Sequence, residues 1–239
     1  MIVARRRALL LILAAVAIIG ALALFAAKPA APPKPPGKPR LLLLTSLPLV
    51  FREDFSLEGS ASRAFAELST SYEVLPISTT APTELQKARL LLMAQPQAQT
   101  AENLVALDDW VRAGGRAMLL ADPLLEWPSS RPLGDPLRPP SMFMDTGLLQ
   151  HWGLRLAPPS ERGPQMRRLG GYDVMTASSG SLSGRCEIAG DRLAARCRIG
   201  KGRAAIVADA DFLDLEDLDG PTDSNLKGLV GELANLRQE

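Results

Sequence analysis

The chain of 239 residues carries 27 lysines and arginines, 26 aspartates and glutamates, and a formal net charge of +1. Its basic and acidic residues are interspersed, which argues against a nucleic-acid partner and against a single-sign field that steers a charged ligand. After the first forty residues, about 200 remain, which is enough for one domain with a sizeable core.

The first segment is an uninterrupted apolar run at residues 8–27. At 1.5 Å of rise per residue, a helix of about twenty residues crosses a hydrocarbon core of roughly 30 Å. Residues 1–7 include three consecutive arginines, and a basic cluster before the first apolar segment is held in the cytoplasm. We therefore expect a single-pass anchor in a bacterial inner membrane, with residues 40–239 forming an exported, periplasmic domain.

A cleaved signal peptide is the alternative interpretation, because small residues stand near the end of the run, at positions 25–27. The apolar core of a signal peptide is usually about 7 to 15 residues, and this run is longer, which favours a retained anchor. Residues 28–39 are rich in proline and poor in backbone donors. They predict a polyproline II linker between the membrane and the domain.

The first half of the exported part alternates apolar, strand-like runs with amphipathic helical segments. Strands are predicted at residues 40–46, 72–77, 88–94 and 116–123, and helices at residues 60–68 and 100–112. Apolar strands that alternate with helices predict an α/β fold, in which a mostly parallel sheet is covered on both faces.

The second half of the domain has a less regular pattern. Residues 123–140 are dense in proline and predict a long loop that leaves the carboxyl end of the fourth strand. The remaining predicted elements are a short helix at 144–154, turn-rich antiparallel strands from about 165 to 200, a buried strand at 201–213 and a closing helix at 225–236.

Cys186 and Cys197 are the two cysteines of the chain. A Gly-Asp turn signal lies between them, flanked by two short strand-like arms, so a hairpin would bring the thiols together. In an oxidising compartment we expect them to form a disulfide worth roughly 2 to 3 kcal/mol. Two separate thiols remain the alternative, because the strand register decides whether the bond can form.

Three segments carry a family resemblance. Residues 90–93 and 104–123 give a strand, a helix, a Gly-Gly stop and a second strand, and residues 200–212 give a Gly-Lys-Gly-Arg strand with an acidic turn. Asn225 precedes the last helix. Together these segments resemble the GldG-like family, auxiliary components of uncharacterised ABC transport systems. The resemblance implies a three-layer, mostly parallel fold similar to class I glutamine amidotransferases and flavodoxin-like domains, and it implies ABC permease and ATPase subunits as partners.

The residue pattern of a catalytic site is missing from the sequence. An amidotransferase-like fold would place a nucleophilic cysteine on a tight strand-to-helix turn, beside a histidine. Neither cysteine follows such a strand, no serine stands in a Gly-x-Ser-x-Gly turn, and His151 is expected in a packing or surface role. No Gly-x-x-x-x-Gly-Lys-Ser/Thr loop is found, so an ATPase must be another subunit. We expect neither a catalytic residue nor a cofactor.

Four polar residues near predicted strand ends are the candidates for binding. Ser46, Asp122 and Asp209 lie at strand carboxyl ends, where open α/β sheets bind ligands, and Asp211 follows in the densest acidic stretch. We expect the fold to expose these carboxylates to a ligand or peptide. The acidic stretch at residues 209–219 lacks the glycine and glutamate spacing of an EF-hand, so a solvated loop is favoured over a metal site.

Three functions remain in competition. The first is a non-catalytic, membrane-anchored binding or scaffold domain that serves a GldG-like ABC-type or envelope complex. The second is an enzyme of amidotransferase-like fold that acts on a cell-envelope substrate through acidic residues, and a close carboxylate pair with a raised pKa would favour it. The third is a structural envelope-assembly spacer without a ligand.

Overall fold

The computed structural model of the chain describes residues 37–51, 53, 61–214 and 224–238. The predicted anchor at residues 8–27 and most of the predicted linker at residues 28–39 lie outside these ranges. Within them, no helix is both long and apolar enough to cross a membrane. The chain divides into two compact units, and the second, which starts at Lys38, contains every helix and strand of the described residues.

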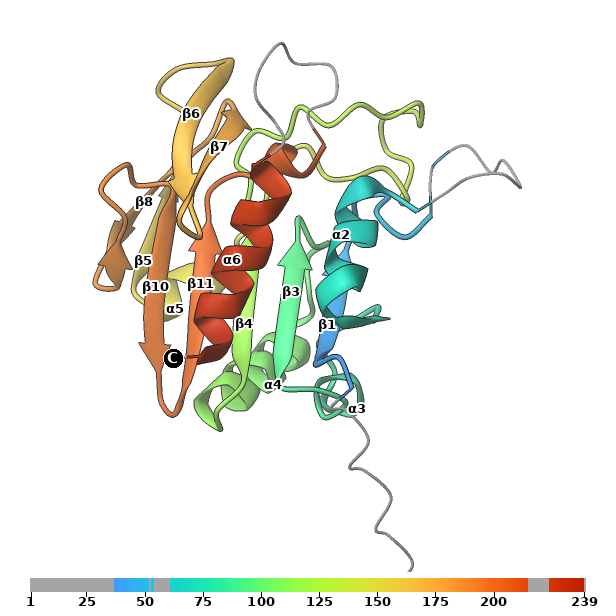
Figure 1. Cartoon of the computed structure of the whole chain (residues 1–239), viewed down its shortest axis with the longest axis vertical. Coiled ribbons are helices and arrows are strands. Elements are labelled where there is room, and N and C mark those ends of the chain that lie inside the picture. The colour runs from blue at the N-terminus through green and yellow to red at the C-terminus, as the bar shows by residue number, and fades with distance from the viewer. Residues whose placement is uncertain (1–36, 52, 54–60, 215–223, 239) are drawn as a thin grey trace, which may run out of the picture. The chain divides into compact units, whose positions relative to one another are not determined.

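A seven-stranded sheet runs through the described part of this unit in the order β2-β1-β3-β4-β11-β10-β9 (Figure 1). The first five strands in that order, β2, β1, β3, β4 and β11, are parallel to one another, whereas β10 is antiparallel to both of its neighbours, β11 and β9. Two further antiparallel pairs join β5 to β8 and β6 to β7. The strands are β1 (Arg40–Thr45), β2 (Glu73–Pro76), β3 (Leu90–Ala94), β4 (Arg116–Leu120), β5 (Leu154–Ala157), β6 (Pro164–Leu169), β7 (Tyr172–Ala177), β8 (Ser181–Gly184), β9 (Glu187–Ile188), β10 (Ala194–Ile199) and β11 (Gly202–Val207).

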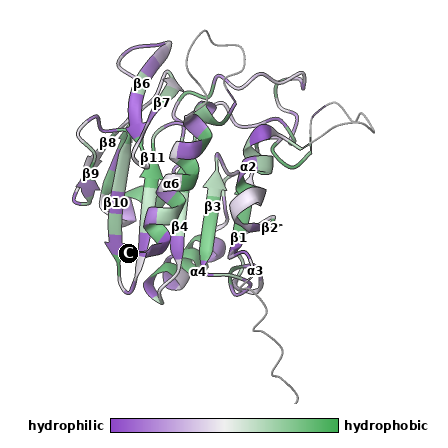
Figure 2. Cartoon of the chain, viewed as in Figure 1, coloured by the Kyte–Doolittle hydropathy of each residue, from purple (hydrophilic) through white to green (hydrophobic). Residues whose placement is uncertain are grey.

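Helices cover both faces of the sheet. Helices α2 (Arg63–Ser71) and α6 (Asn225–Gln238) pack on one face, and α3 (Pro82–Leu85), α4 (Ala101–Arg112) and α5 (Leu148–His151) pack on the other. Successive residues of a strand point to opposite faces, so the leucines of β1 divide between two apolar clusters. Figure 2 shows the same pattern as apolar central strands beneath helices with polar outer surfaces. The predicted α/β fold with a mainly parallel sheet is confirmed.

Helix α4 follows the signals in its sequence. The Thr100 hydroxyl caps its first turn by accepting from the amide of Asn103, at 3.4 Å. Gly114 ends it with a positive φ of 114°, and a side chain at Gly115 would collide with the Trp110 ring. The Gly-Gly stop therefore lets the chain turn directly from α4 into β4.

The structure corrects three predicted boundaries. The predicted helix at 144–154 is only the four-residue α5, because Gly147 and Gly153 both have a positive φ. The predicted strand at 201–213 ends at Val207 and is followed by a 3-10 turn, η1 (Asp211–Leu213). The fourth strand, predicted at 116–123, ends at Leu120. At the last two boundaries an aspartate accepts backbone amide protons and turns the chain.

Candidate functional site

The carboxyl edge of the sheet brings three of the four predicted site residues together. Asp122 follows β4, while Asp209 and Asp211 follow the adjacent strand β11. The carboxyl groups of Asp122 and Asp211 are in hydrogen-bonding contact. Negative charge from both of these residues acts on the third carboxyl, that of Asp209.

The expectation that these carboxylates are exposed is wrong, because Asp122 and Asp209 are 0% exposed and Asp211 is 2% exposed. Their oxygens accept protons from the backbone of the surrounding loops. Asp122 accepts from the amides of Leu124 and Ala210, both at 2.8 Å. Such bonds replace the water that buried carboxylates lose, and they hold the loops that follow β4 and β11 against each other.

Asp209 and Asp211 extend this arrangement to neighbouring segments. Asp209 accepts from the amides of Phe212 at 2.9 Å and of Ala177, at the end of β7, at 3.2 Å. Asp211 accepts from the amide of Glu126 at 2.8 Å, which ties the proline-rich loop to the sheet. The three aspartates thus organise the backbone of three strand ends.

Burial raises the pKa of each carboxyl group in the cluster, and repulsion between carboxylates adds to this shift for Asp209 and Asp211. For Asp211, burial and then the nearby Asp122 raise the pKa to about 8. Burial, with charge from Asp122 and Asp211, raises the pKa of Asp209 well above its ordinary value. Burial also raises the pKa of Asp122, although its hydrogen bonds oppose this shift. A buried cluster of this kind retains a proton at neutral pH, and the raised pKa values belong to the coupled carboxyl groups together.

Gln95 directly follows β3, in the turn that leads towards α4. Its backbone has a positive φ of 43°, and its side chain is fully buried. The side-chain amide forms a fork with Asp122, accepting from its backbone N–H at 3.0 Å and donating to its carbonyl at 3.2 Å. Ser46, the fourth predicted site residue, is half-buried and donates to the carbonyl of Gln95. The turn therefore binds its own neighbours rather than presenting a reactive group.

Sequence reasoning missed Gln95, Glu126 and Ser178 as parts of this edge. The Ser178 hydroxyl donates to Glu126 Oε1 at 2.9 Å and accepts from the amide of Gly163 at 2.9 Å. Like Gln95, Ser178 is a buried polar residue directly after a strand, and its φ is also positive, at 50°. A polar residue that ends an apolar strand was the available signal. Among the described residues, no group of His, Cys, Asp or Glu side chains has the arrangement of a metal site.

The loops above this edge expose large apolar side chains. Phe51 follows β1 and is 82% exposed, and Leu133 and Leu137 follow β4 and are 88% and 63% exposed. Glu53 joins the two loops, because its carboxylate accepts from the hydroxyls of Ser129 and Ser130 at 2.6 and 3.1 Å. Exposed apolar side chains therefore lie on two loops that the Glu53 carboxylate joins by hydrogen bonds.

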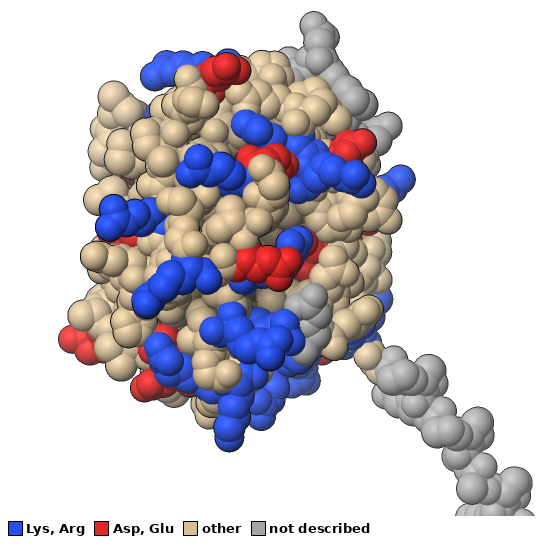
Figure 3. Space-filling model, turned by 90° about the vertical axis from the view of Figure 1, so that its left-hand side faces the viewer, with Lys and Arg blue, Asp and Glu red and all other residues tan. Residues whose placement is uncertain are grey.

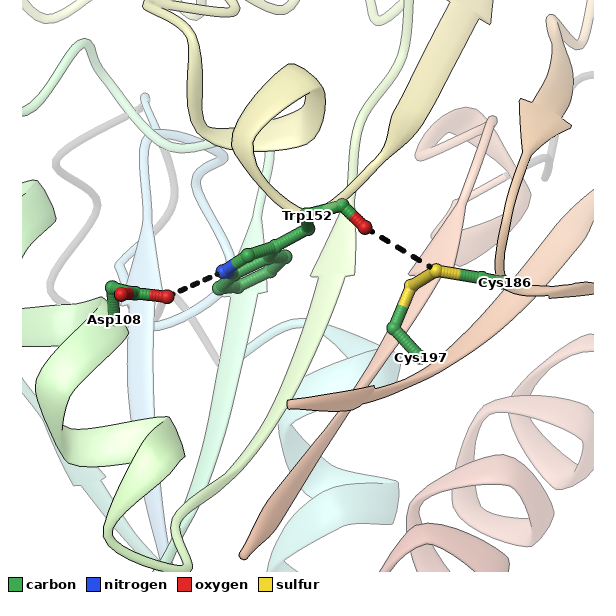
Figure 4. Close-up of a disulfide and its surroundings, with 4 residues drawn as sticks. All are labelled: Asp108, Trp152, Cys186 and Cys197. Carbon is green, nitrogen blue, oxygen red and sulfur yellow. Dashed lines mark hydrogen bonds between the residues drawn. A yellow bond between two sulfur atoms is a disulfide. The ribbon is translucent and has the colours of Figure 1, made fainter. Parts of the chain in front are cut away.

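The predicted disulfide between Cys186 and Cys197 is present, with 4.8 Å between the two Cα atoms (Figure 4). The antiparallel register of β9 and β10, with Glu187 opposite Arg196, places the two cysteines opposite each other. The Trp152 ring lies between the disulfide and α4 and donates to Asp108 Oδ1 at 2.9 Å. His151 is exposed and contacts the same carboxylate at 3.2 Å, so both side chains contribute to packing α5 on α4.

A cavity of about 450 Å³ opens beside this disulfide. Its walls come from β10, β11 and the last turns of α6, and four arginines line it: Arg185, Arg196, Arg198 and Arg203. Arg196 donates two bonds of 2.7 Å to the carboxylate of Glu232, which is 1% exposed. Arg198 and Arg203 lie nearer the amino edge of the sheet, and Arg185 lies beside its outer strand, β9.

The family model described as "ABC-type uncharacterized transport system" matches residues 38–159. This range contains β1 to β5 together with both loops that carry the exposed apolar side chains. A search of curated proteins finds no match.

Solved structures resemble the chain at low identity. The exo-beta-1,4-mannosidase Op5Man5 from Opitutaceae bacterium strain TAV5 is 14% identical, with a TM-score of 0.48, over 83% of this chain and 36% of that one. The beta-galactosidase from Bacillus circulans sp. alkalophilus is 12% identical, with a TM-score of 0.49, over 84% and 31%. Cytoplasmic protein STM3548 from Salmonella typhimurium is 9% identical, with a TM-score of 0.48, over 82% and 98%. The chain spans about a third of the length of the two glycosidases, and likenesses at this level do not bear on activity.

Proposed function

Since this chain belongs to the family of ABC-type uncharacterized transport system auxiliary proteins, we propose that it is a non-catalytic accessory component of a membrane transport complex. The family match over residues 38–159 is the observation that carries this proposal. The turn at Gln95 supports it, because the side chain there is engaged in hydrogen bonds to Asp122 rather than available for reaction. The buried aspartates support it too, since a substrate has no access to them.

The partner-binding surface in this proposal is the loop pair that carries Phe51, Leu133 and Leu137. Scattered single apolar side chains are ordinary on protein surfaces, whereas a contiguous exposed patch marks an interaction site, and in this proposal the three side chains form such a patch. The Glu53 bonds reduce the entropy that the loops would lose on binding. The partner proposed for this surface is the permease of the complex, and the ATPase would be recovered through the permease.

The proposal includes export and anchoring by residues 8–27, with the domain in the periplasm. The disulfide supports this location, because disulfides persist in oxidising compartments and are rare in the cytosol. A reporter that works only outside the cytoplasm, fused after Glu239, is expected to be active. Activity of a cytoplasmic reporter alone would contradict the proposed topology.

Co-purification from native membranes tests the accessory function. The full chain, solubilised in mild detergent, should bring down a multi-span permease and an ATPase that mass spectrometry identifies. Replacing Leu133 and Leu137 by serine should abolish this recovery without changing the melting temperature, because both side chains are exposed. The control replaces Val105 and Met166, which are 61% and 49% exposed on other surfaces. Equal recovery with both pairs of substitutions would refute the proposed interface.

The carboxyl cluster favours a second candidate, an enzyme that uses paired acids. Asp122 and Asp211 form a close pair with raised pKa values, as a general acid and its partner would. Their burial and their bonds to loop amides weigh against it. Asp211→Asn should leave the cellular function of an accessory protein intact and abolish that of an acid-dependent enzyme, and complementation of a deletion strain separates the two.

A further inference from the structure

Three neighbouring strands begin or end with arginines that stand side by side at the amino edge of the sheet. In the sheet register, Arg203 of β11 pairs with Arg116 of β4 on one side and with Arg198 of β10 on the other. Residues in register point to the same face, so the three side chains form one row beneath the C-terminal turns of α6. Figure 3 shows lysine and arginine side chains gathered at this end of the molecule.

Such a row opposes folding unless something offsets it, because like charges directly across a sheet repel each other. The C-terminus of α6 offsets part of this repulsion, with an effective charge of about −0.5. The Nε atom of Arg116 is buried and has no hydrogen-bond partner in the described part of the chain. Arg198, the exposed member of the row, is the one that an external anion can reach.

Further cations extend the row along the amino edge. Lys38 lies two residues before β1, Arg40 begins β1, Arg89 precedes β3, and Lys201 lies in the turn from β10 to β11; all four are exposed. Glu73 pairs with Arg40 at 3.1 Å. For Arg89, Arg198 and Lys201, the described residues supply no ion pair or side-chain hydrogen bond, so these charges face solvent. The 450 Å³ cavity opens beside the row, with Arg198 and Arg203 in its wall.

The domain receives the predicted linker at this same edge, because Lys38 lies two residues before β1. A polyproline II linker of about ten residues spans roughly 30 Å, so a membrane anchor would keep the row close to the lipid headgroups. We propose that the exposed cations of the amino edge, Arg198 of the row together with Lys201, Arg89 and Lys38, dock on the anionic phospholipid headgroups of the membrane in which the chain is anchored. This inference rests on the anchor included in the proposed function. In the docked orientation the carboxyl edge and its apolar loops face the periplasm, so the permease would contact them with a segment that projects from the bilayer.

Lysine acylation can test the docking on the full chain. The protein is mixed with nanodiscs of phosphatidylcholine alone or of phosphatidylcholine with phosphatidylglycerol, and mass spectrometry follows the acylation rate of each lysine. Lys201 and Lys38 mark the basic edge, and exposed Lys227 near the start of α6 is the internal control. Phosphatidylglycerol should slow acylation of Lys201 and Lys38 but not of Lys227. Salt of about 1 M, which shortens the screening length to about 3 Å, should restore their rates.

Charge-removing variants make the test specific. Arg89→Gln with Arg198→Gln should lower the docking equilibrium roughly 25-fold, at about fivefold for each cation lost near an anionic surface. The matched control, Arg162→Gln with Arg168→Gln, removes the same charge from exposed positions away from the amino edge and should retain protection of Lys201. If both double variants lost the protection of Lys201 equally, docking would depend on net charge alone, and its assignment to the amino edge would be overturned.

The outcomes separate docking from anchoring. Incorporation into nanodiscs, scored by resistance to alkaline extraction, reports the anchor, whereas protection of Lys201 reports docking. Protection without incorporation would refute the anchor and support lipid binding. Lack of protection in phosphatidylglycerol would refute the inference whether or not the chain inserts. Protection of Lys201 by inorganic phosphate without lipid would assign the row to a soluble anion instead and would also overturn it.

Discussion

The two edges of the central sheet use charge in opposite ways. At the carboxyl edge, Asp122, Asp209 and Asp211 are buried and accept backbone amide protons. At the amino edge, Arg198 and Lys201 are exposed, and Arg198 faces a second arginine across the strands. The two sets of charges therefore have different tasks. The buried aspartates hold loops in place, and the exposed cations are available to an external partner. Charge at a strand end is therefore interpretable only together with its burial and its hydrogen bonds.

The largest expected effect is the loss of an internal carboxylate. Asp122→Ala would leave the amides of Leu124 and Ala210 without their acceptor, at about 1 to 3 kcal/mol for each buried donor. Relief of repulsion within the cluster offsets part of this loss. At roughly 2 to 4 °C per kcal/mol, the melting temperature measured by circular dichroism should fall by about 5 to 15 °C. Exposed Asp109→Ala should change it little, and equal melting of the two variants would contradict a loop-holding role.

The disulfide is expected to have the next largest effect, because it closes the outer strands beside the cationic row. Its two cysteines are separated by 11 positions, and cross-linking such a short loop stabilises by roughly 2 to 3 kcal/mol in the chain-entropy model. Replacing both cysteines with serine should lower the melting temperature by about 4 to 12 °C. Reductant should lower the stability of the parent protein by the same amount and leave the double variant unchanged. A response of the variant to reductant would contradict this assignment.

A pH titration distinguishes the two edges with a smaller effect. Burial and Asp122 raise the pKa of Asp211 from 3.8 to about 8, so the folded state holds a proton that the unfolded chain releases. The stability from this group is complete below the unfolded pKa and declines as pH rises towards the folded pKa. Melting temperatures from about pH 5 to about pH 9 should therefore fall less steeply in Asp211→Asn, whose amide can still donate to Asp122. Parallel curves would show that Asp211 ionises normally.

The smallest effect is expected at the amino edge. Arg198→Gln should change the free energy of unfolding by less than about 0.5 kcal/mol, with a slight gain from relieved repulsion against Arg203. Arg196, two positions earlier on the same strand, is the contrast, because its loss would leave the buried carboxylate of Glu232 without its ion-pair partner and should destabilise the fold measurably more than Arg198→Gln does. Chemical denaturation measures both variants. A large loss in Arg198→Gln would show that the row supports the fold.

Much of the fold could be predicted because its signals are local. The leucine runs of β1 and β3 are buried on both faces, and Thr100 with Gly114 bounds α4 as capping chemistry requires. The cysteine pair could be predicted because a short hairpin determines its own register. Helix α3 was missed, since a four-residue helix that begins at Pro82 lacks a helical period.

The candidate site was harder to predict from the sequence. Asp122 and Asp209 could be placed at the correct edge because each follows a predicted strand. Their burial could not be predicted, because it depends on a proline-rich loop that has no sequence periodicity and is held over them by the bond from the Glu126 amide to Asp211. The arginine row was also overlooked. Arg116, Arg198 and Arg203 are separated by up to 87 positions along the chain and become neighbours only through a sheet register that no local pattern encodes.

Gln95 has a consequence for how freely this sequence could be rewritten. A left-handed backbone favours glycine or asparagine, so a designer working from φ alone would replace the glutamine. Glycine would relax the backbone but would remove the fork to Asp122 and the bond to the carbonyl of Pro140. Asparagine has the amide but is one methylene shorter than that fork requires. Position 95 thus tolerates few amino acids, although no reaction takes place there in the proposed function. A library of variants randomised at this codon should return glutamine among its most stable members.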